Sequence, residues 1–560
     1  MSATTKNKLL GQFIRNNKLK VFGVIVTGFI SSVLKILIPI SITQYYSLVF
    51  ETDSPKLLVL NIFPDYFTDT IPHFLFFFFF LVFTTGVFDF LERLGKGTLG
   101  ELFLFDLRKI LFSKQLHIKQ LTYDQKGTGR YLLRYSGDLS SIQRYLTRGI
   151  LQFIIDLLFI TLTMAVLFAI NPTICFIIVA CAFTSYITII FVNSWLYRIS
   201  SNRRNRKSGL LSFVNTHLRS MLSIKSFNKE NQTYKRFGKR AKRILALGID
   251  YHIANSFIQA MTKSTVYLVL GITLTFVHLS AWQSGSALFI TVLVLVSILP
   301  LFRRTLRVYS IWEMGNISFA KLVLIINEKT EEQPNKDSLN RIRGNRVIIR
   351  NLRFEHEDGK ELFHGQSFVI PSKSITFING KGKTTLAKIL LGIYDHYTGT
   401  VKINRTNIRY VPPKTIRRKV TIASKEWPLY GRRVFDAICY NKKEKKKIEA
   451  AALLEKLQSH WDGQLTLETP IGELGQRLSH NQYILLCYAR AVLTRKKILI
   501  LDLPFQNLAP ALRETLINHI NTLKDKKTII IFGQRKSQFK QLEIDREFTL
   551  GSPPLQYTLN

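Results

Sequence analysis

The feature that most constrains this chain is a series of apolar stretches in its first half, each close to the length of a membrane-crossing helix. They lie near residues 21–49, 71–90, 150–170, 173–195, 253–282 and 286–302. A helix that crosses the hydrocarbon core of a bilayer needs about 20 mostly apolar residues, so the pattern predicts six membrane spans. Residues 1–20 mix Leu and Phe with Lys and Arg, which is typical of a helix that lies at a membrane surface.

The composition is basic and rich in aromatic residues. The 560 residues include 78 Lys plus Arg against 37 Asp plus Glu, a formal charge of +41, and 41 Phe. The apolar stretches exclude a disordered polycation and a purely soluble nucleic-acid-binding protein. Basic loops beside membrane spans explain the charge, and the basic runs of the second half lack the interleaved aromatic residues of a nucleic-acid groove. We therefore expect a membrane protein with no nucleic-acid partner.

The charges of the loops predict the orientation. The segments after the second and fourth expected spans are rich in Lys and Arg, whereas residues 51–73 contain one Lys and four acids. Positively charged loops stay on the cytoplasmic side. The sequence therefore predicts a multi-pass protein of the cell (plasma or inner) membrane with both termini in the cytoplasm. Each cytoplasmic segment is about 55 residues long, enough for paired helices that project about 35 to 40 Å from the bilayer.

After residue 327 the pattern changes to short apolar runs alternating with helical stretches, which predicts an α/β domain. The run 374–378 leads into Asn379-Gly380-Lys381-Gly382-Lys383-Thr384-Thr385, which opens an apolar helix. A strand, a glycine loop and a helix start favour bound phosphate, because backbone N–H groups and the helix dipole attract an anion there. The usual spacing would place a first glycine at Phe377, so we expect a loop shortened by about two residues.

Five further segments occur in a fixed order. They are Tyr123-Asp124-Gln125-Lys126-Gly127-Thr128-Gly129-Arg130, Ile224-Lys225-Ser226-Phe227, Thr469-Pro470-Ile471-Gly472-Glu473-Leu474-Gly475, Leu478-Ser479-His480-Asn481-Gln482 and Ile498-Leu499-Ile500-Leu501-Asp502. In this order they resemble the two intracellular loops, the exporter-specific loop, the signature and the Walker B strand of ABC transporters of the exporter fold. The resemblance implies a half-transporter with an all-α six-helix transmembrane domain and long intracellular helical loops over residues 1–327. It further implies a linker over 328–345 and an α/β P-loop NTPase (ABC ATPase) domain over 346–560.

The same resemblance implies ATP and Mg²⁺ as cofactors and gives roles to particular residues. Thr384 and Asp502 would hold Mg²⁺, and Ser479 would reach the nucleotide of the partner subunit. The nucleotide-binding positions in this chain are Asn379, Gly380, Lys381, Gly382, Lys383, Thr384, Thr385, Ser479, Gln482 and, in place of the aromatic residue that stacks on adenine, His356.

Several catalytic positions of the family are replaced here. Leu503 stands where an acid would polarise the attacking water, and Gln534 stands where a His would contact the terminal phosphate. Lys425 replaces a magnesium-ligating Gln, and His480 and Asn481 replace the two signature glycines. Loss of a catalytic base costs about 10² to 10⁴ in rate, so no residue of this chain is assigned a catalytic role. Three alternatives stay open for this domain: nucleotide binding without efficient turnover, a structural remnant, and catalysis by another route.

The expected function is ATP-dependent transport of an unknown substrate as one half of a dimer embedded in membrane lipid. Because both sets of site residues are altered, a heterodimer with a better-conserved half-transporter is favoured over a homodimer. The alternative is a non-catalytic membrane regulator or assembly subunit with a vestigial nucleotide-binding domain. Lys35, Asp156 and Lys263 lie within expected spans, where a charge is costly. They form either a polar substrate pathway or an internal Lys-to-Asp pair, or their side chains snorkel to the membrane surface.

Overall fold

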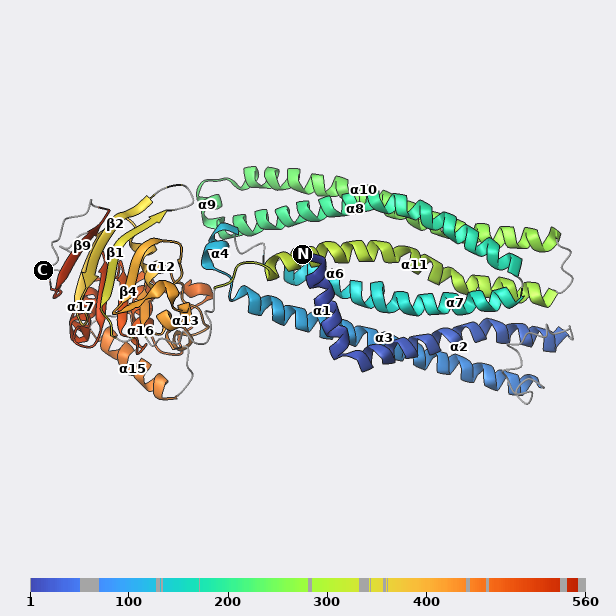
Figure 1. Cartoon of the computed structure of the whole chain (residues 1–560), viewed down its shortest axis with the longest axis horizontal. Coiled ribbons are helices and arrows are strands. Elements are labelled where there is room, and N and C mark those ends of the chain that lie inside the picture. The colour runs from blue at the N-terminus through green and yellow to red at the C-terminus, as the bar shows by residue number, and fades with distance from the viewer. Residues whose placement is uncertain are drawn as a thin grey trace. The chain divides into compact units, whose positions relative to one another are not determined.

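The computed structural model describes residues 2–50, 70–126, 131, 134–170, 172–279, 285–331, 342, 344–355, 359, 361–439, 444–459, 463–533 and 541–551. The chain divides into two compact units. One contains Met1–Ile118 and Tyr123–Lys329, and the other contains Lys119–Thr122 and Thr330–Asn560. The first is helical and the second is an α/β unit (Figure 1).

The N-terminal part of the chain forms long helices joined by short segments. They are α1 (Ser2–Asn16), α2 (Lys18–Phe50), α3 (Ile71–Gln115), α4 (Gln120–Lys126), α6 (Leu139–Arg144), α7 (Gln152–Ile170), α8 (Pro172–Arg219), α9 (Met221–Ser226), α10 (Glu230–Leu279) and α11 (Gly285–Ile326). Two π-helical segments, η3 (Arg134–Asp138) and η4 (Tyr145–Leu151), flank α6. Each of α2, α3, α8 and α11 contains one of the stretches expected to cross the membrane, whereas the stretch 150–170 covers the end of η4 and all of α7, and α10 contains residues 253–279 of the stretch 253–282.

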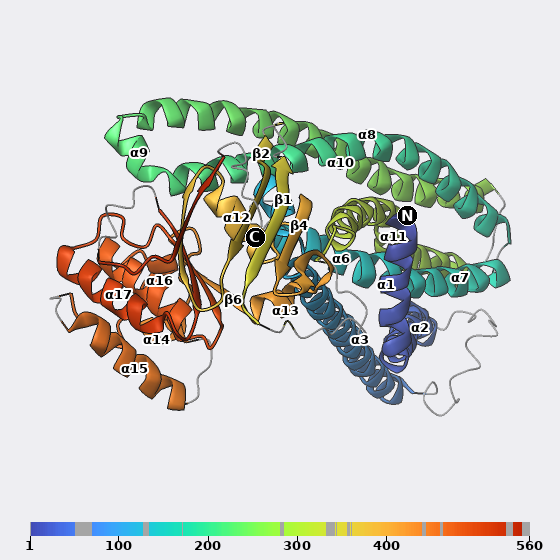
Figure 2. The same cartoon turned by 60° about the vertical axis from the view of Figure 1, so that its left-hand side comes forward.

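Three helical segments among the described residues are long and apolar enough to cross a bilayer: Lys18–Ile42, Ile71–Gln115 and Leu139–Ala165. The expected outer loop at 51–69 lies outside the described residues. The helices α3, α8 and α10 continue well beyond the apolar stretches, and α8 and α10 run side by side in both views (Figures 1 and 2). These extensions are the long helical loops expected from the sequence.

An aromatic cluster packs α1, α3 and α11 together. The rings of Phe13 and Phe103 lie 4.8 Å apart between centroids, and those of Phe103 and Phe319 lie 6.5 Å apart. All three side chains are buried. The short helix α1 therefore packs against the long helices through its apolar face, and its Lys6 donates a hydrogen bond to Asn316 on α11 at 2.5 Å.

The α/β unit contains two sheets. An antiparallel sheet has the order β2-β1-β4-β5, and a parallel sheet has the order β6-β7-β8-β3-β9. The strands are β1 (Val347–Glu355), β2 (Glu361–Ile370), β3 (Ile375–Gly380), β4 (Thr398–Ile403), β5 (Thr406–Asn407), β6 (Val420–Ala423), β7 (Ile498–Asp502), β8 (Thr528–Phe532) and β9 (Arg546–Leu550). The helices are α12 (Lys383–Leu390), α13 (Pro413–Arg417), α14 (Val434–Ile438), α15 (Glu444–Gln458), α16 (His480–Val492) and α17 (Pro510–Leu523), and the short turns are η6 (Ile408–Tyr410) and η7 (Glu473–Gly475).

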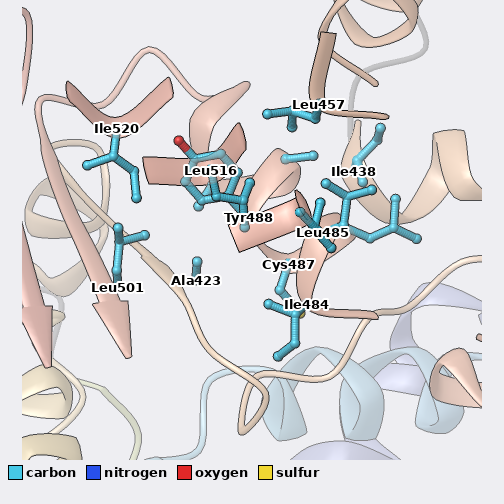
Figure 3. Packing of buried hydrophobic residues seen from close by; sticks show 14 of the residues in the cluster. Ala423, Ile438, Leu457, Ile484, Leu485, Cys487, Tyr488, Leu501, Leu516 and Ile520 are labelled. Carbon is cyan, nitrogen blue, oxygen red and sulfur yellow. The ribbon is translucent and has the colours of Figure 1, made fainter. Parts of the chain in front are cut away.

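The strands β7 and β8 are buried along their whole length, as expected for central strands of a parallel sheet covered on both faces. One core cluster packs α16 and α17 against this sheet, with Leu485, Leu501 and Leu516 among its fully buried members (Figure 3). Two of the four cysteines, Cys439 and Cys487, belong to this cluster and are free thiols. Because β3, β7 and β8 are parallel, their carboxyl ends meet at one edge of the sheet, where ligands bind in open α/β sheets.

Candidate functional site

The glycine loop follows β3 at this edge and is very short. The strand keeps its pairing with β9 through Gly380, opposite Leu550, and α12 begins at Lys383, so only Lys381 and Gly382 lie between the strand and the helix. Gly380 has φ +98°, and a side chain there would overlap the Leu550 carbonyl oxygen. Glycine at this position is therefore required by both the backbone conformation and the close approach of β9.

Two charged groups of opposite sign lie at the end of the sheet. The Lys383 ammonium donates a hydrogen bond to the Gly380 carbonyl oxygen at 2.5 Å. The Ser424 hydroxyl, just after β6, donates to Asp502 Oδ2 at 3.1 Å. Burial raises the pKa of Asp502, although the Ser424 hydrogen bond and the charge of Lys383 favour its ionised form. Burial also lowers the pKa of Lys383, which the nearby Asp502 charge opposes.

These residues fit part of a magnesium nucleotide site. The N-terminus of α12 and Lys383 suit a phosphate group, and the Thr384 hydroxyl and Asp502 carboxylate are oxygen ligands of the kind that Mg²⁺ binds. The turn of two residues surrounds less of a phosphate chain than a longer loop does, because it offers fewer backbone N–H groups. Asp502 is buried, and its charge acts on Lys383. These two residues therefore suit a terminal phosphate and its metal ion, whereas the turn provides only part of the backbone that surrounds the remaining phosphates in a longer loop.

The position expected for the acid that polarises water carries a hydrocarbon. Leu503 has φ +50°, and its N–H donates to the Phe532 carbonyl oxygen at 3.0 Å, so this residue is fixed at the end of β7 by β8. A Leu side chain neither accepts a proton nor orients water. Lys425 is exposed after β6. Two further positions at which this chain replaces a family residue, His356 and Gln534, lie outside the described residues.

The residues of the signature segment form the start of α16. Ser479 is its N-cap: its hydroxyl accepts from the Gln482 N–H at 3.3 Å, and its own N–H donates to Gln482 Oε1 at 2.9 Å. His480 Nε2 donates to the Gln506 carbonyl oxygen at 2.9 Å, and Asn481 Oδ1 accepts from the Ala509 N–H at 3.4 Å. The side chains of His480 and Asn481, which replace the two signature glycines, thus join α16 to the loop after β7. The sequence showed the replacement of the glycines but not these contacts.

The charged residues expected in the spans lie in different surroundings. Lys35 is half-exposed on α2 and forms an ion pair of 2.6 Å with Asp89 on α3. Asp156 is fully buried on α7. Lys263 is exposed on α10. The structure therefore does not bring these three side chains together in one cluster.

Asp156 belongs to a polar network that joins α3, α7 and α11. Arg304 on α11 donates from Nε to Asp156 Oδ2 at 2.7 Å and from Nη2 to Oδ1, and Gln152 donates to Oδ1 at 2.8 Å. Lys96 on α3 donates to Gln152 and also pairs with Glu92 at 2.5 Å. Sequence reasoning missed Arg304. One signal in the sequence could have found it. Arg304 lies two positions beyond an expected span, and a basic residue there can pair with an acid inside another span.

Comparison with known proteins agrees with this architecture. The model of the ABC transporter transmembrane region matches residues 21–306, about half of the chain, and the model of the ABC transporter domain matches residues 364–506. The chain therefore belongs to the ABC transporter family, as the sequence motifs predicted. It is a multi-pass membrane protein that carries an ABC ATPase domain, and half-transporters of this kind act as dimers.

Individual relatives cover most of the chain at low identity. An uncharacterized ABC transporter ATP-binding protein of Bacillus subtilis, YknV, is 23% identical over 465 residues, which are 80% of this chain and 75% of that protein. An ATP-dependent lipid A-core flippase of Saccharophagus degradans is 23% identical over 451 residues, covering 78% of this chain and 76% of that protein. The structure of a bacterial Atm1-family ABC exporter with ATP bound matches with a TM-score of 0.80 and 17% identity, over 97% of this chain and 95% of that chain. The exporter fold predicted from the sequence is thereby confirmed.

Proposed function

We propose that this chain is the catalytically degenerate subunit of a heterodimeric ABC transporter that moves an unidentified substrate across a cell membrane, with both termini and the ATPase domain in the cytoplasm. The observation that carries the proposal is the combination at one sheet edge of retained phosphate and magnesium residues, Lys383, Thr384 and Asp502, with Leu503 in place of the catalytic acid. Such a site favours binding MgATP without efficient turnover.

In this proposal the bound nucleotide supplies binding energy that holds two ATPase domains together. Lys383 neutralises phosphate charge, and Thr384 and Asp502 hold the metal ion. Ser479, fixed at the N-cap of α16, faces the nucleotide of the partner subunit. The partner provides the acid that this chain lacks and hydrolyses ATP at its own Walker residues.

The test is ATP binding and turnover by the full-length chain in lipid nanodiscs, alone and together with the half-transporter that copurifies from its native membrane. We expect nucleotide binding by both preparations and turnover only by the pair. Lys383→Ala should weaken binding by the chain alone at least tenfold, because it removes the charged donor to phosphate. A homodimer with full turnover, or a pair that remains inactive, would contradict the proposal.

A second candidate is a regulatory or assembly subunit with a vestigial nucleotide-binding domain. The observation that favours it is the turn of two residues between β3 and α12, in which the Lys383 ammonium is hydrogen-bonded to the chain's own Gly380 carbonyl oxygen. The same experiment separates the two candidates: a vestigial domain binds no nucleotide, and Lys383→Ala then leaves every measured quantity unchanged.

A further inference from the structure

The hairpin of α8 and α10 contains a hollow of about 440 Å³ with basic walls. Five cationic side chains line it: Arg206 of α8 and Arg236, Lys239, Arg240 and Arg243 of α10. Gly209 of α8 forms another part of the wall. We refer to this feature as the basic hollow. The two helices that form it lie side by side in both views (Figures 1 and 2).

Among the described residues, acidic side chains do not neutralise this charge. In the part of the chain that the structure describes, no carboxylate lines the basic hollow, and none of its five cations is ion-paired with an acid. Arg236 and Arg240 are four residues apart on one helix, as are Lys239 and Arg243, and like charges at this spacing destabilise a helix. A bound anion would relieve that repulsion.

The side chains are suited to one ligand chemistry. Arginine presents a planar fork of N–H donors that matches phosphate oxygens, and four of the five cations are arginines. Arg236 and Arg243 are seven residues apart, about 10 Å along the helix axis. A ligand with two or more phosphate groups spans that distance and can contact both guanidinium groups at once. The volume also lies in the range of small-molecule sites.

We propose that the basic hollow binds a ligand that carries two or more phosphate groups. The ligand is either a soluble polyphosphate anion or a phosphorylated lipid headgroup, since the apolar stretch expected at 253–282 begins about 15 Å along α10 from Arg243. The proposal does not depend on the transport function or on nucleotide binding by the ATPase domain.

The first test measures binding of inorganic tripolyphosphate to the full-length chain in phosphatidylcholine nanodiscs. The background is Lys383→Ala, which weakens phosphate binding at the candidate nucleotide site. Arg236→Gln with Arg243→Gln should reduce the affinity about tenfold or more, because two charged donors are lost. Arg240 is left in place because its guanidinium also lies over the Phe213 ring, 4.8 Å from its centroid.

The matched control is Lys235→Gln with Lys242→Gln. These residues are exposed on the same helix and do not line the basic hollow, so the change in net charge is equal. We expect the control to alter the affinity less than about threefold, since exposed charges outside the site act only through screened interactions. Equal losses in both double variants would mean that net charge alone attracts the anion, which would overturn the proposal.

A second pair of variants keeps all five cations. A β-carbon added at Gly209 meets no atom within 4 Å, so Gly209→Glu and Gly209→Gln can be compared at this position. The two substitutions have the same size and differ in charge. Gly209→Glu should weaken tripolyphosphate binding clearly more than Gly209→Gln.

The last arm identifies the source of the phosphate groups. Nanodiscs that contain cardiolipin, which carries two phosphates, are dissolved in detergent, and the cardiolipin retained per chain is measured by mass spectrometry. Retention that depends on Arg236 and Arg243 without tripolyphosphate binding supports the proposal with a lipid ligand, and the reverse result supports it with a soluble ligand. If neither ligand responds to the Arg236 and Arg243 substitutions, the proposal is wrong.

Discussion

Replacing Arg304 by Met would leave the carboxylate of Asp156 without its cation in the interior of the helical unit. Asp156 is fully buried and accepts two hydrogen bonds from Arg304, so the Arg304 guanidinium provides most of the compensation of its negative charge. Gln152 continues to donate one hydrogen bond. Removing one partner of a buried ion pair typically costs about 3 to 5 kcal/mol.

The expected cost lies at the lower end of that range. The Arg304 side chain is 49% exposed, so water shares in solvating the cation, although it does not reach the acid. We therefore expect about 3 kcal/mol. For a helical unit of about 325 residues, that corresponds to a fall in melting temperature of roughly 4 to 5 °C.

The assay is thermal unfolding of the full-length chain in nanodiscs, followed by intrinsic fluorescence. Arg304→Met with Asp156→Asn should recover most of the loss, because the buried charge is removed together with its partner. Arg93→Met is the matched control: Arg93 is 76% exposed in its pair with Asp89 and should cost less than about 1 kcal/mol. A melting temperature of Arg304→Met within about 2 °C of the wild type, or a double variant no more stable than the single one, would refute the reasoning.

Three further predictions concern the ATPase domain. Burial lowers the pKa of His519 to about 4. On acidification, the unfolded chain binds a proton at this residue near pH 6.5, whereas the folded chain does so only near pH 4. The free energy of unfolding should therefore fall as the pH drops between these values, by about 2 kcal/mol at pH 5. Melting of the full-length chain from pH 7.5 to 5 measures this slope, and His519→Gln should abolish it. Gly380→Ala forces a side chain against Leu550 at a positive φ and should destabilise the domain by about 2 kcal/mol or more in the same assay, whereas Gly86→Ala, in open space, should not. Leu503→Glu should not restore ATP turnover by the chain alone, because the phosphate turn stays short; a rise to the rate of the proposed heterodimer would contradict this view.

Much of the architecture could be predicted from local patterns. The apolar run that ends in Asp502 became a buried strand over the same residues, and the described residues of each long apolar stretch became helical. These patterns work because the period of burial along one element is local information.

The details of the site depend on contacts between distant segments, which no local pattern contains. The sequence predicted a shortened loop, but the pairing of Gly380 with Leu550, 170 residues later, draws the glycine into the strand. In the same way, the loss of two signature glycines was readable, whereas the bonds of His480 and Asn481 to the loop after β7 were not. The counter-ion of Asp156 lies 148 residues away on another helix.

The two-residue turn after β3 also has an evolutionary consequence. A lost side chain can be regained by a single codon change, whereas a phosphate loop of ordinary length could be regained here only by inserting codons between a strand in fixed register with β9 and a helix packed in the core. Insertions are rarer than substitutions, and in a buried element they shift every residue that follows. The shortening of the turn is therefore difficult to reverse in evolution. Descendants of this chain can readily change its surface and its cargo, while its own phosphate loop stays short.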